Sequence, residues 1–175
     1  MTHADDKHYR AWITHRVDLA PGLWMIRVRP EGEFRFVPGQ YATLGLEGNG
    51  YRSERPYSIC SAPHEKELEF FFELVPGGEL TPQIYERQLG DELLLRKIPK
   101  GRFTLDLNGE RKNHFLMCTV TGVAPFVSYV RTLFKHWKEG VFAGDHRLYL
   151  VNGASRSWEF GYFEELRRFS EATPD

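Results

Sequence analysis

The sequence predicts a β plus α/β fold, in which a six-stranded antiparallel β-barrel is followed by an incomplete doubly wound parallel α/β domain. From residue 8 to about residue 107, short apolar stretches alternate with Gly and Pro turn signals, a pattern typical of an antiparallel barrel or sandwich. From about residue 113, solid apolar stretches alternate with helical apolar stripes, which is typical of a βαβ unit. We therefore expect two domains, at residues 7–108 and 113–175.

Six strands are expected in the first domain, and turn signals separate them. Pro30 closes the second strand, and Pro38-Gly39 precedes the third. The expected strands are residues 9–14, 23–28, 40–44, 67–74, 91–96 and 102–105. Residues 55–58 are also expected to be extended, which would place Arg55 and Tyr57 on one face and Ser58 on the other.

A short helix is expected to interrupt these strands at Thr81. Thr81 is a favourable N-cap, Pro82 suits the first helical position, and Leu80 and Tyr85 can form a hydrophobic staple. The preceding turn, Pro76-Gly77-Gly78, allows a tight approach of the backbone. A glycine-rich turn before a helix N-terminus can bind a phosphate, but a well-capped barrel helix without a ligand explains the same pattern.

The second domain is expected to hold two parallel strands and two helices. The solid apolar stretches at 114–120 and 148–151 predict strands buried on both faces. Pro125 opens the first helix, and a second is expected over 158–169. Its inward residues would be Phe160, Phe163, Leu166 and Phe169. Two parallel strands cannot cover their own faces and edges, so this domain is expected to be unfinished.

Composition excludes several classes of protein. Hydrophobic residues make up 41% of the 175 residues and charged residues 27%, which is typical of a globular chain. The formal net charge of -1 disfavours nucleic acid as a partner, because binding to phosphates needs concentrated positive charge. No apolar run reaches the ~20 residues of a membrane span. With no signal-like start and two distant cysteines, Cys60 and Cys118, we expect a cytoplasmic protein with reduced thiols.

The segment Arg55-Pro56-Tyr57-Ser58 is the clearest candidate for a ligand site. A guanidinium beside an aromatic ring can hold a phosphate and offer a stacking surface to a planar ligand. A surface ion pair beside a half-buried tyrosine would explain the same tetrapeptide. Seven scattered histidines show no spacing that suits a metal, so no metal site is expected.

Six short motifs follow one another along the chain. They are residues 36–41 (FVPGQY), 55–58 (RPYS), 76–82 (PGGELTP), 90–92 (GDE), 101–103 (GRF) and 121–125 (TGVAP). Together, and in this order, they resemble the motifs of ferredoxin–NADP reductases of the bacterial type. The resemblance covers nearly the whole chain and implies a six-stranded FAD-binding barrel followed by a nicotinamide-nucleotide domain.

The resemblance assigns roles to residues of both domains. It implies that Arg55 pairs with the FAD phosphate, that Tyr57 lies against the isoalloxazine or ribityl chain, and that Ser58 sits near flavin N5. It also implies that Phe71 packs against the adenine side and that Thr121 faces flavin and nicotinamide together. Ser58 and Thr121 are thus the expected catalytic residues. The expected cofactor-binding residues are Arg55, Pro56, Tyr57, Ser58, Phe71, Glu79, Leu80, Thr81, Thr121, Ser155 and Arg156, with residues 79–81 as a backbone clamp on the pyrophosphate.

The chain also departs from the family pattern. Val120 stands where the family usually has glycine, and a β-branched residue tolerates positive φ badly. In the loop after the second parallel strand, Ser155 and Arg156 are candidates for a 2′-phosphate, although the arginine is shifted by one place. Later family segments have no counterpart, so the polypeptide resembles a reductase truncated in its nucleotide domain. We expect it to be reduced only weakly by NADPH.

The function implied is FAD-dependent electron transfer between NADPH and a one-electron carrier, ferredoxin or flavodoxin, as in EC 1.18.1.2. The cofactors would be FAD and, as co-substrate, NADP(H). Two alternatives stay open: a non-enzymatic flavin-binding module, and the reductase component of an oxygenase that uses FMN or FAD with NADH. Neither nucleic acid nor a membrane is an expected partner, and the sequence leaves the oligomeric state open.

Overall fold

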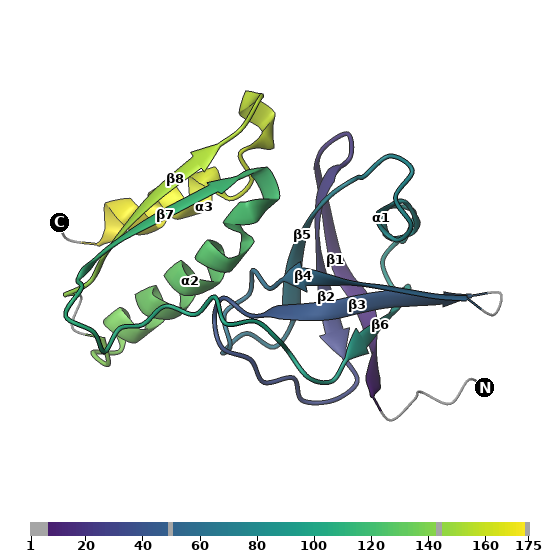
Figure 1. Cartoon of the computed structure of the whole chain (residues 1–175), viewed down its shortest axis with the longest axis horizontal. Helices are drawn as coiled ribbons and strands as arrows, with labels where there is room; N and C mark the ends of the chain where they lie inside the picture. Colours follow the sequence, from purple (N-terminus) through teal and green to yellow (C-terminus); the bar gives the residue numbers. More distant parts are fainter. Residues whose placement is uncertain (1–6, 49–50, 143–144, 174–175) are drawn as a thin grey trace.

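The computed structural model describes residues 7–48, 51–142 and 145–173, which form a barrel-like lobe and a smaller α/β lobe (Figure 1). The first lobe is one six-stranded sheet with the order β4-β3-β6-β1-β2-β5. Its strands pair antiparallel throughout. They are β1 (His8–Ala20), β2 (Leu23–Pro30), β3 (Tyr41–Gly48), β4 (Tyr51–Ser58), β5 (Leu68–Glu73) and β6 (Glu92–Arg96). The predicted six-stranded antiparallel fold is confirmed.

One of the six expected strands is wrong. Residues 102–105 form no strand, and the sixth strand is β4, of which the sequence indicated only residues 55–58. The segment at 102–105 lies beside the second lobe: the Phe103 carbonyl accepts a hydrogen bond from the Tyr129 hydroxyl, and the Phe103 side chain is 57% exposed. Its apolar residues therefore pack outside the sheet.

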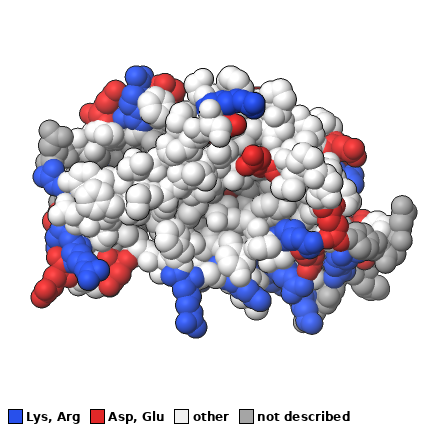
Figure 2. Space-filling model, turned by 45° about the horizontal axis from the view of Figure 1, so that its top comes forward, with Lys and Arg blue, Asp and Glu red and all other residues white. Residues whose placement is uncertain are grey.

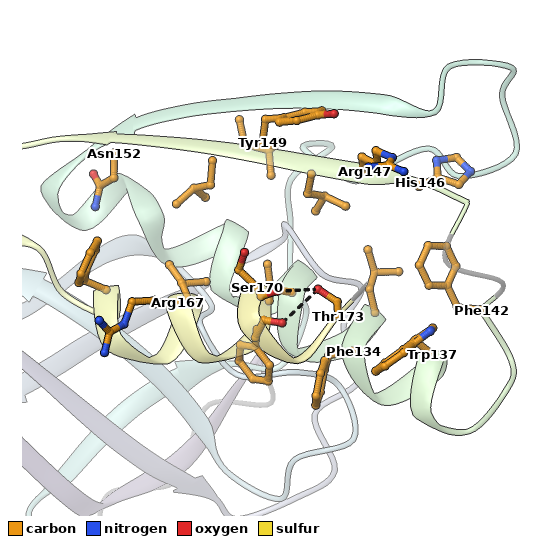
Figure 3. Close-up of a pocket in the computed structure, with 18 of the residues that line it drawn as sticks. Phe134, Trp137, Phe142, His146, Arg147, Tyr149, Asn152, Arg167, Ser170 and Thr173 are labelled. Atoms are coloured by element: carbon orange, nitrogen blue, oxygen red, sulfur yellow. Dashed lines mark hydrogen bonds between the residues drawn. The ribbon is translucent and has the colours of Figure 1, made fainter. Parts of the chain in front are cut away.

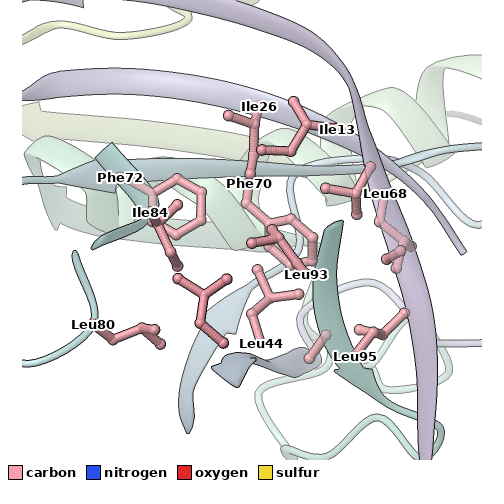
Figure 4. Close-up of a cluster of buried hydrophobic side chains, with 14 of the residues drawn as sticks. Ile13, Ile26, Leu44, Leu68, Phe70, Phe72, Leu80, Ile84, Leu93 and Leu95 are labelled. Atoms are coloured by element: carbon pink, nitrogen blue, oxygen red, sulfur yellow. The ribbon is translucent and has the colours of Figure 1, made fainter. Parts of the chain in front are cut away.

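Aromatic and branched side chains fill the barrel (Figure 4). Trp24 of β2 stacks on Phe72 of β5 with 5.2 Å between ring centroids. The short helix α1 (Thr81–Tyr85) closes one end, where Leu80 and Ile84 are buried. The N-cap is Leu80 rather than the expected Thr81. The Thr81 hydroxyl instead accepts a hydrogen bond from the Val75 amide at 3.1 Å, so it ties the preceding loop and not the helix.

The second lobe places two helices on one side of a parallel pair of strands (Figure 1). Its elements are β7 (Asn113–Thr119), the 3-10 turn η1 (Val120–Val123), α2 (Ala124–Lys138), β8 (Arg147–Gly153), the 3-10 turn η2 (Ser157–Glu159) and α3 (Phe163–Ala172). The helix expected over 158–169 is interrupted, because Tyr162 has a φ of 66°. The four residues expected to point inward, Phe160, Phe163, Leu166 and Phe169, all line a cavity between these strands and helices, although Phe160 and Phe163 are 37% and 56% exposed.

The outer face of the β7–β8 pair is apolar and bare among the described residues. Phe115, Met117 and Val151 are 70%, 76% and 57% exposed, whereas the sequence predicted strands buried on both faces. Tyr149 points away from the helices (Figure 3) and stacks on Phe115 at 4.8 Å. The side of the molecule turned forward in Figure 2 carries few charges. No helix in the described ranges has the length and apolarity needed to cross a membrane.

Candidate functional site

The candidate site lies where the end of β4 meets the loop between β5 and α1. Arg55 of β4 forms an ion pair with Glu79 of that loop and donates a 2.7 Å hydrogen bond to the Glu54 carbonyl. The Arg55 side chain is 52% exposed and that of Glu79 is 37% exposed. Since Leu80 and Thr81 follow Glu79 directly, this pair brings the expected phosphate-binding arginine to the expected backbone clamp. A guanidinium has five N–H donors, so Arg55 can hold an anion as well as these two partners.

The loop that carries Glu79 is tightly folded. Gly77 has a φ of 72°, and the Gly78 amide donates a 2.9 Å hydrogen bond to the Val75 carbonyl. A Cβ at Gly78 would lie 2.9 Å from that same carbonyl oxygen, so only glycine fits there. The Gln83 side chain donates to the Glu79 carbonyl at 2.6 Å. These contacts fix the backbone that precedes the first turn of α1, whose amides have no acceptor within the helix.

Tyr57 supplies an aromatic surface on the same strand as Arg55, two residues further along β4. Its half-buried ring packs on Phe72 at a centroid distance of 4.6 Å. Burial raises the pKa of the Tyr57 hydroxyl to about 12, against a smaller lowering by the charge of Arg55. The phenol is therefore neutral at physiological pH. Pro56 is exposed beside it, and the half-buried Ser58 ends the strand opposite Tyr41.

The remaining expected site residues lie in the second lobe. Thr121 is half-buried in η1, directly after Val120, which has a φ of 42°. Ser155 and Arg156 are exposed, and their backbone amides donate to the Glu159 carboxylate at 2.9 and 3.0 Å. The structure thus adds Glu159 to this loop, and no sequence spacing indicated that its carboxylate would occupy these amides. Binding of a 2′-phosphate there stays a prediction.

Phe71 does not lie in the Arg55 site. Its side chain is 4% exposed and makes an edge-to-face contact with Tyr162 of the second lobe, with 5.5 Å between centroids. On β5, side chains alternate, so Phe70 and Phe72 point into the barrel while Phe71 points to the interface. The expected contact of Phe71 with an adenine stays a prediction, and Tyr162 of the second lobe contacts the ring in this structure.

A separate cavity of about 730 Å³ lies in the second lobe, between the strands and the helices (Figure 3). Its lining is rich in aromatic side chains, among them Phe134, Trp137 and Phe142. None of the expected site residues lines it. In the described part of the chain, no three His, Cys, Asp or Glu side chains are grouped so as to hold a metal ion.

The residues at the barrel edge fit a flavin nucleotide. An exposed guanidinium and a rigid glycine loop suit a phosphate, and a neutral aromatic ring suits a planar group. Glu79 is the exception, because its carboxylate competes with an anionic ligand for Arg55. Ser58, the last residue of β4, directly follows Tyr57.

The barrel and its edge have known counterparts. Residues 22–105 match the family described as oxidoreductase FAD-binding domain. A ferredoxin–NADP reductase of Pseudomonas aeruginosa is 40% identical over 97 residues, which cover 55% of this chain and 38% of the relative. The reductase component of the naphthalene 1,2-dioxygenase system of Pseudomonas putida is 35% identical over 114 residues, or 63% and 32% of the two chains.

A solved structure matches both lobes. A ferredoxin NADP+ reductase from Neisseria gonorrhoeae, determined with bound FAD and NADP, superposes with a TM-score of 0.85 at 25% identity. The match covers 97% of this chain and 66% of that one. The barrel is thus similar to the FAD-binding domains of oxidoreductases. Over this region the chain is similar to ferredoxin–NADP reductases, and it spans about two-fifths of the length of several curated relatives.

Proposed function

We propose that this chain binds FAD at the Arg55–Glu79 edge of the barrel and transfers electrons between a nicotinamide nucleotide, NADPH, and a one-electron carrier such as ferredoxin or flavodoxin. The observation that carries the proposal is the Arg55–Glu79 contact, because it joins two segments 24 residues apart into one anion-binding surface. The names of the matching relatives support the choice of nucleotide and carrier. Residues 7–108 would be the flavin domain and 113–175 part of the nucleotide domain.

Each residue of the barrel edge has a distinct task in this proposal. Arg55 neutralises and orients the diphosphate, together with backbone amides at residues 79–81. Tyr57, neutral and half-buried, holds the planar ring by stacking, and Ser58 supplies a hydroxyl at the ring edge. Thr121 would face the same edge from the second lobe. FAD, once bound, supplies the ability to take two electrons together and to release them singly.

A second candidate is the reductase component of an oxygenase system, using FMN or FAD with NADH. The similarity to the Pseudomonas putida reductase component favours it. The glycine loop that precedes residues 79–81 favours a ligand with a diphosphate, and hence FAD over FMN. Comparing the reduction of bound flavin by NADPH and by NADH separates the two candidates. Flavin that binds but is reduced by neither nucleotide would indicate a non-enzymatic flavin module.

Titration of the flavin-free protein with FAD tests the proposed site. Replacement of the guanidinium in Arg55→Ala should weaken FAD binding roughly 10- to 150-fold, which corresponds to the ~1.5–3 kcal/mol of a charge-assisted hydrogen bond. Flavin fluorescence measures the dissociation constant. Riboflavin, which has no phosphate, is the matched ligand control. It should bind more weakly than FAD, with the same affinity for the wild-type protein and for Arg55→Ala. Equal FAD affinity before and after the substitution would contradict the assigned role of Arg55.

Replacement of the Glu79 carboxylate tests the same surface, with an expected change in FAD affinity opposite to that of Arg55→Ala. In the free protein Glu79 holds the guanidinium that the diphosphate requires. Glu79→Gln removes this competition, so FAD should bind about 1.5- to 5-fold more tightly, the range expected from an exposed ion pair. Glu33→Gln, which removes a surface pair with Arg35 elsewhere on the barrel, is the control and should leave the affinity unchanged.

A further inference from the structure

The interface between the two lobes contains a fully buried carboxylate. The side chain of Glu69, on β5 of the barrel, is 0% exposed. It accepts hydrogen bonds from Arg27 Nε of the barrel at 2.7 Å and from the Tyr162 hydroxyl of the second lobe at 2.8 Å. Arg131 Nη2, on α2, lies 2.9 Å from Oε1 of Glu69, the oxygen that also accepts the hydrogen bond from Tyr162. A buried carboxylate is costly unless it is paired, and the second lobe supplies two of the three side-chain partners named here.

Arg131 is held in place from its own lobe as well. It donates from Nε and Nη2 to the two carboxylate oxygens of Glu165 on α3, at 2.7 and 3.0 Å. Burial by itself would lower the pKa of the Arg131 guanidinium, but the hydrogen bond with Glu165 and the charges of Glu69, Glu165 and Glu65 raise it above its ordinary value. Arg131 therefore stays charged, and it connects α2, α3 and β5.

The backbone at Tyr162 is shaped for this contact. Tyr162 adopts a φ of 66°, which costs a bulky side chain about 1–3 kcal/mol. The strained turn places its hydroxyl on Glu69 and its ring against Phe71. A Cβ at Gly161 would lie 2.4 Å from the Phe71 ring, so the turn also needs glycine at that position. Strain of this kind persists only where surrounding contacts hold it.

The interface between the lobes is connected to the proposed reaction site through residues of both lobes: Ser61 follows Ser58 in the barrel, and α2 follows Thr121 in the second lobe. Ser61, three residues after Ser58, accepts a hydrogen bond at its carbonyl from the Ser128 hydroxyl at 2.7 Å. Its own hydroxyl accepts the Glu69 amide at 3.1 Å. Ser128 and Arg131 lie on α2, which begins just after Thr121 and rises about 1.5 Å per residue as a rigid rod. Fixing Arg131 against Glu69 therefore fixes Thr121 relative to Ser58.

We propose that Glu69 is a positioning residue, whose buried contacts with Arg131 and Tyr162 hold the second lobe in the one orientation that presents Thr121 to the flavin edge. The inference rests on the proposed function for the purpose of the orientation, but the contacts themselves do not depend on it. Glu69 touches neither Arg55 nor the loop at residues 76–81 in any contact described here, so its loss should leave FAD binding intact.

The native thiol of Cys60 gives a direct measurement of lobe separation. Cys60 is 0% exposed within the apolar interface, next to Val123 and Val127, and burial raises its thiol pKa. It reacts with a thiol reagent only when the lobes separate. In a Cys118→Ser background, labelling should become ~100-fold faster or more with Glu69→Gln, as expected when one partner of a buried pair is lost. Tyr162→Phe, which removes the hydroxyl that is hydrogen-bonded to Glu69 and to the Cys60 thiol, should accelerate it roughly tenfold.

Glu67→Gln is the matched control, because Glu67 pairs with Arg29 on the same two strands but within the barrel. It should leave Cys60 labelling unchanged. A Cys60→Ser, Ala42→Cys reporter in the barrel core distinguishes lobe separation from unfolding of the barrel. If Glu69→Gln does not fold, Tyr162→Phe decides the test. Cys60 labelling at the wild-type rate in a folded Glu69→Gln or Tyr162→Phe variant would overturn the proposal.

In the FAD-loaded protein, the positioning role of Glu69 is tested by the rate at which NADPH reduces the bound flavin. Glu69→Gln should leave the FAD dissociation constant within about twofold of wild type, while reduction of the bound flavin by NADPH slows ~10-fold or more, because misplacement by 1 Å is costly in rate. Equal reduction rates with faster Cys60 labelling would refute the role in positioning. A wild-type chain that binds no FAD would remove the proposed function while leaving the labelling result valid.

Discussion

Val120 combines a β-branched side chain with a backbone conformation that such side chains rarely adopt. Its φ of 42° lies in the left-handed region, which β-branched residues avoid. It is also partly buried against the interface cluster, so its side chain contributes packing. The sequence predicted this conflict, because the resemblance placed valine at a usual glycine position, and the structure confirms the positive φ.

Substitution of Val120 separates these two effects. Val120→Ala and Val120→Gly both lose the packing, but only glycine relieves the strained φ. Elsewhere glycine costs roughly 0.5–1 kcal/mol relative to alanine. Here the glycine variant should be at least as stable as the alanine variant in urea unfolding. A glycine variant that is less stable than alanine by the usual margin would show that the positive φ carries no strain.

At the level of individual residues, the sequence predicts how candidate site residues are arranged where they are neighbours in the chain. Arg55, Tyr57 and Ser58 share one strand, so their relation follows from local geometry. The side-chain contact of Glu79 with Arg55 depends on how two distant segments meet. The contact of Phe71 with the second lobe was likewise not predictable, since alternation along β5 fixes its face but not which lobe covers that face.

Among the elements, β1, β4 and β6 are tied by one carboxylate. Glu54 of β4 is hydrogen-bonded to His8 of β1 and, at 2.9 Å, to Arg96 Nε of β6. Burial raises the pKa of Glu54, but the hydrogen bonds from Arg96 and His8 outweigh it, and the pKa lies below its ordinary value of 4.5. The stability from this group is thus present above the ordinary pKa and is lost as the pH falls through the lower folded value.

Glu54→Gln should reveal this dependence. At neutral pH the variant should lose about 1–3 kcal/mol of unfolding free energy, the worth of hydrogen bonds to a charged group. In acid the difference from wild type should shrink, because the wild-type carboxylate becomes protonated. Glu47→Gln on β3 removes a more exposed pair with Arg52 and should change stability by at most ~1 kcal/mol. A Glu54→Gln difference that is constant across the acid range would contradict the linkage.

Sequence periodicity correctly predicted whether most segments form a helix or a strand, but it did not predict where some of these elements begin or end. Apolar stretches and Pro125 correctly predicted β7, α2 and β8. The 102–105 stretch failed because its phenylalanine packs on Phe126 and Tyr129 of α2 rather than across a sheet. The helix expected over 158–169 failed at Tyr162, where the contact with Glu69 imposes a turn that helical periodicity does not report.

At the scale of the whole molecule, the two lobes differ in how completely they are covered. The barrel encloses its own core, while the β7–β8 pair leaves large apolar side chains exposed on one face of its described residues. The sequence predicted the class of both lobes and the incomplete sheet, because these depend on periodicity and strand number. It did not predict the buried ion pair of Arg131 with Glu69 between the lobes, which joins residues 62 positions apart.

We propose that one ligand spans Tyr57, Arg55 and the loop at residues 79–81. A crystal structure of the chain reconstituted with FAD tests it most directly. We predict the isoalloxazine against Tyr57 and Ser58, and the diphosphate within hydrogen-bonding distance of Arg55 and the backbone of Leu80 and Thr81. Flavin bound elsewhere, for instance in the aromatic cavity of the second lobe with the Arg55–Glu79 edge free of ligand, would contradict the claim.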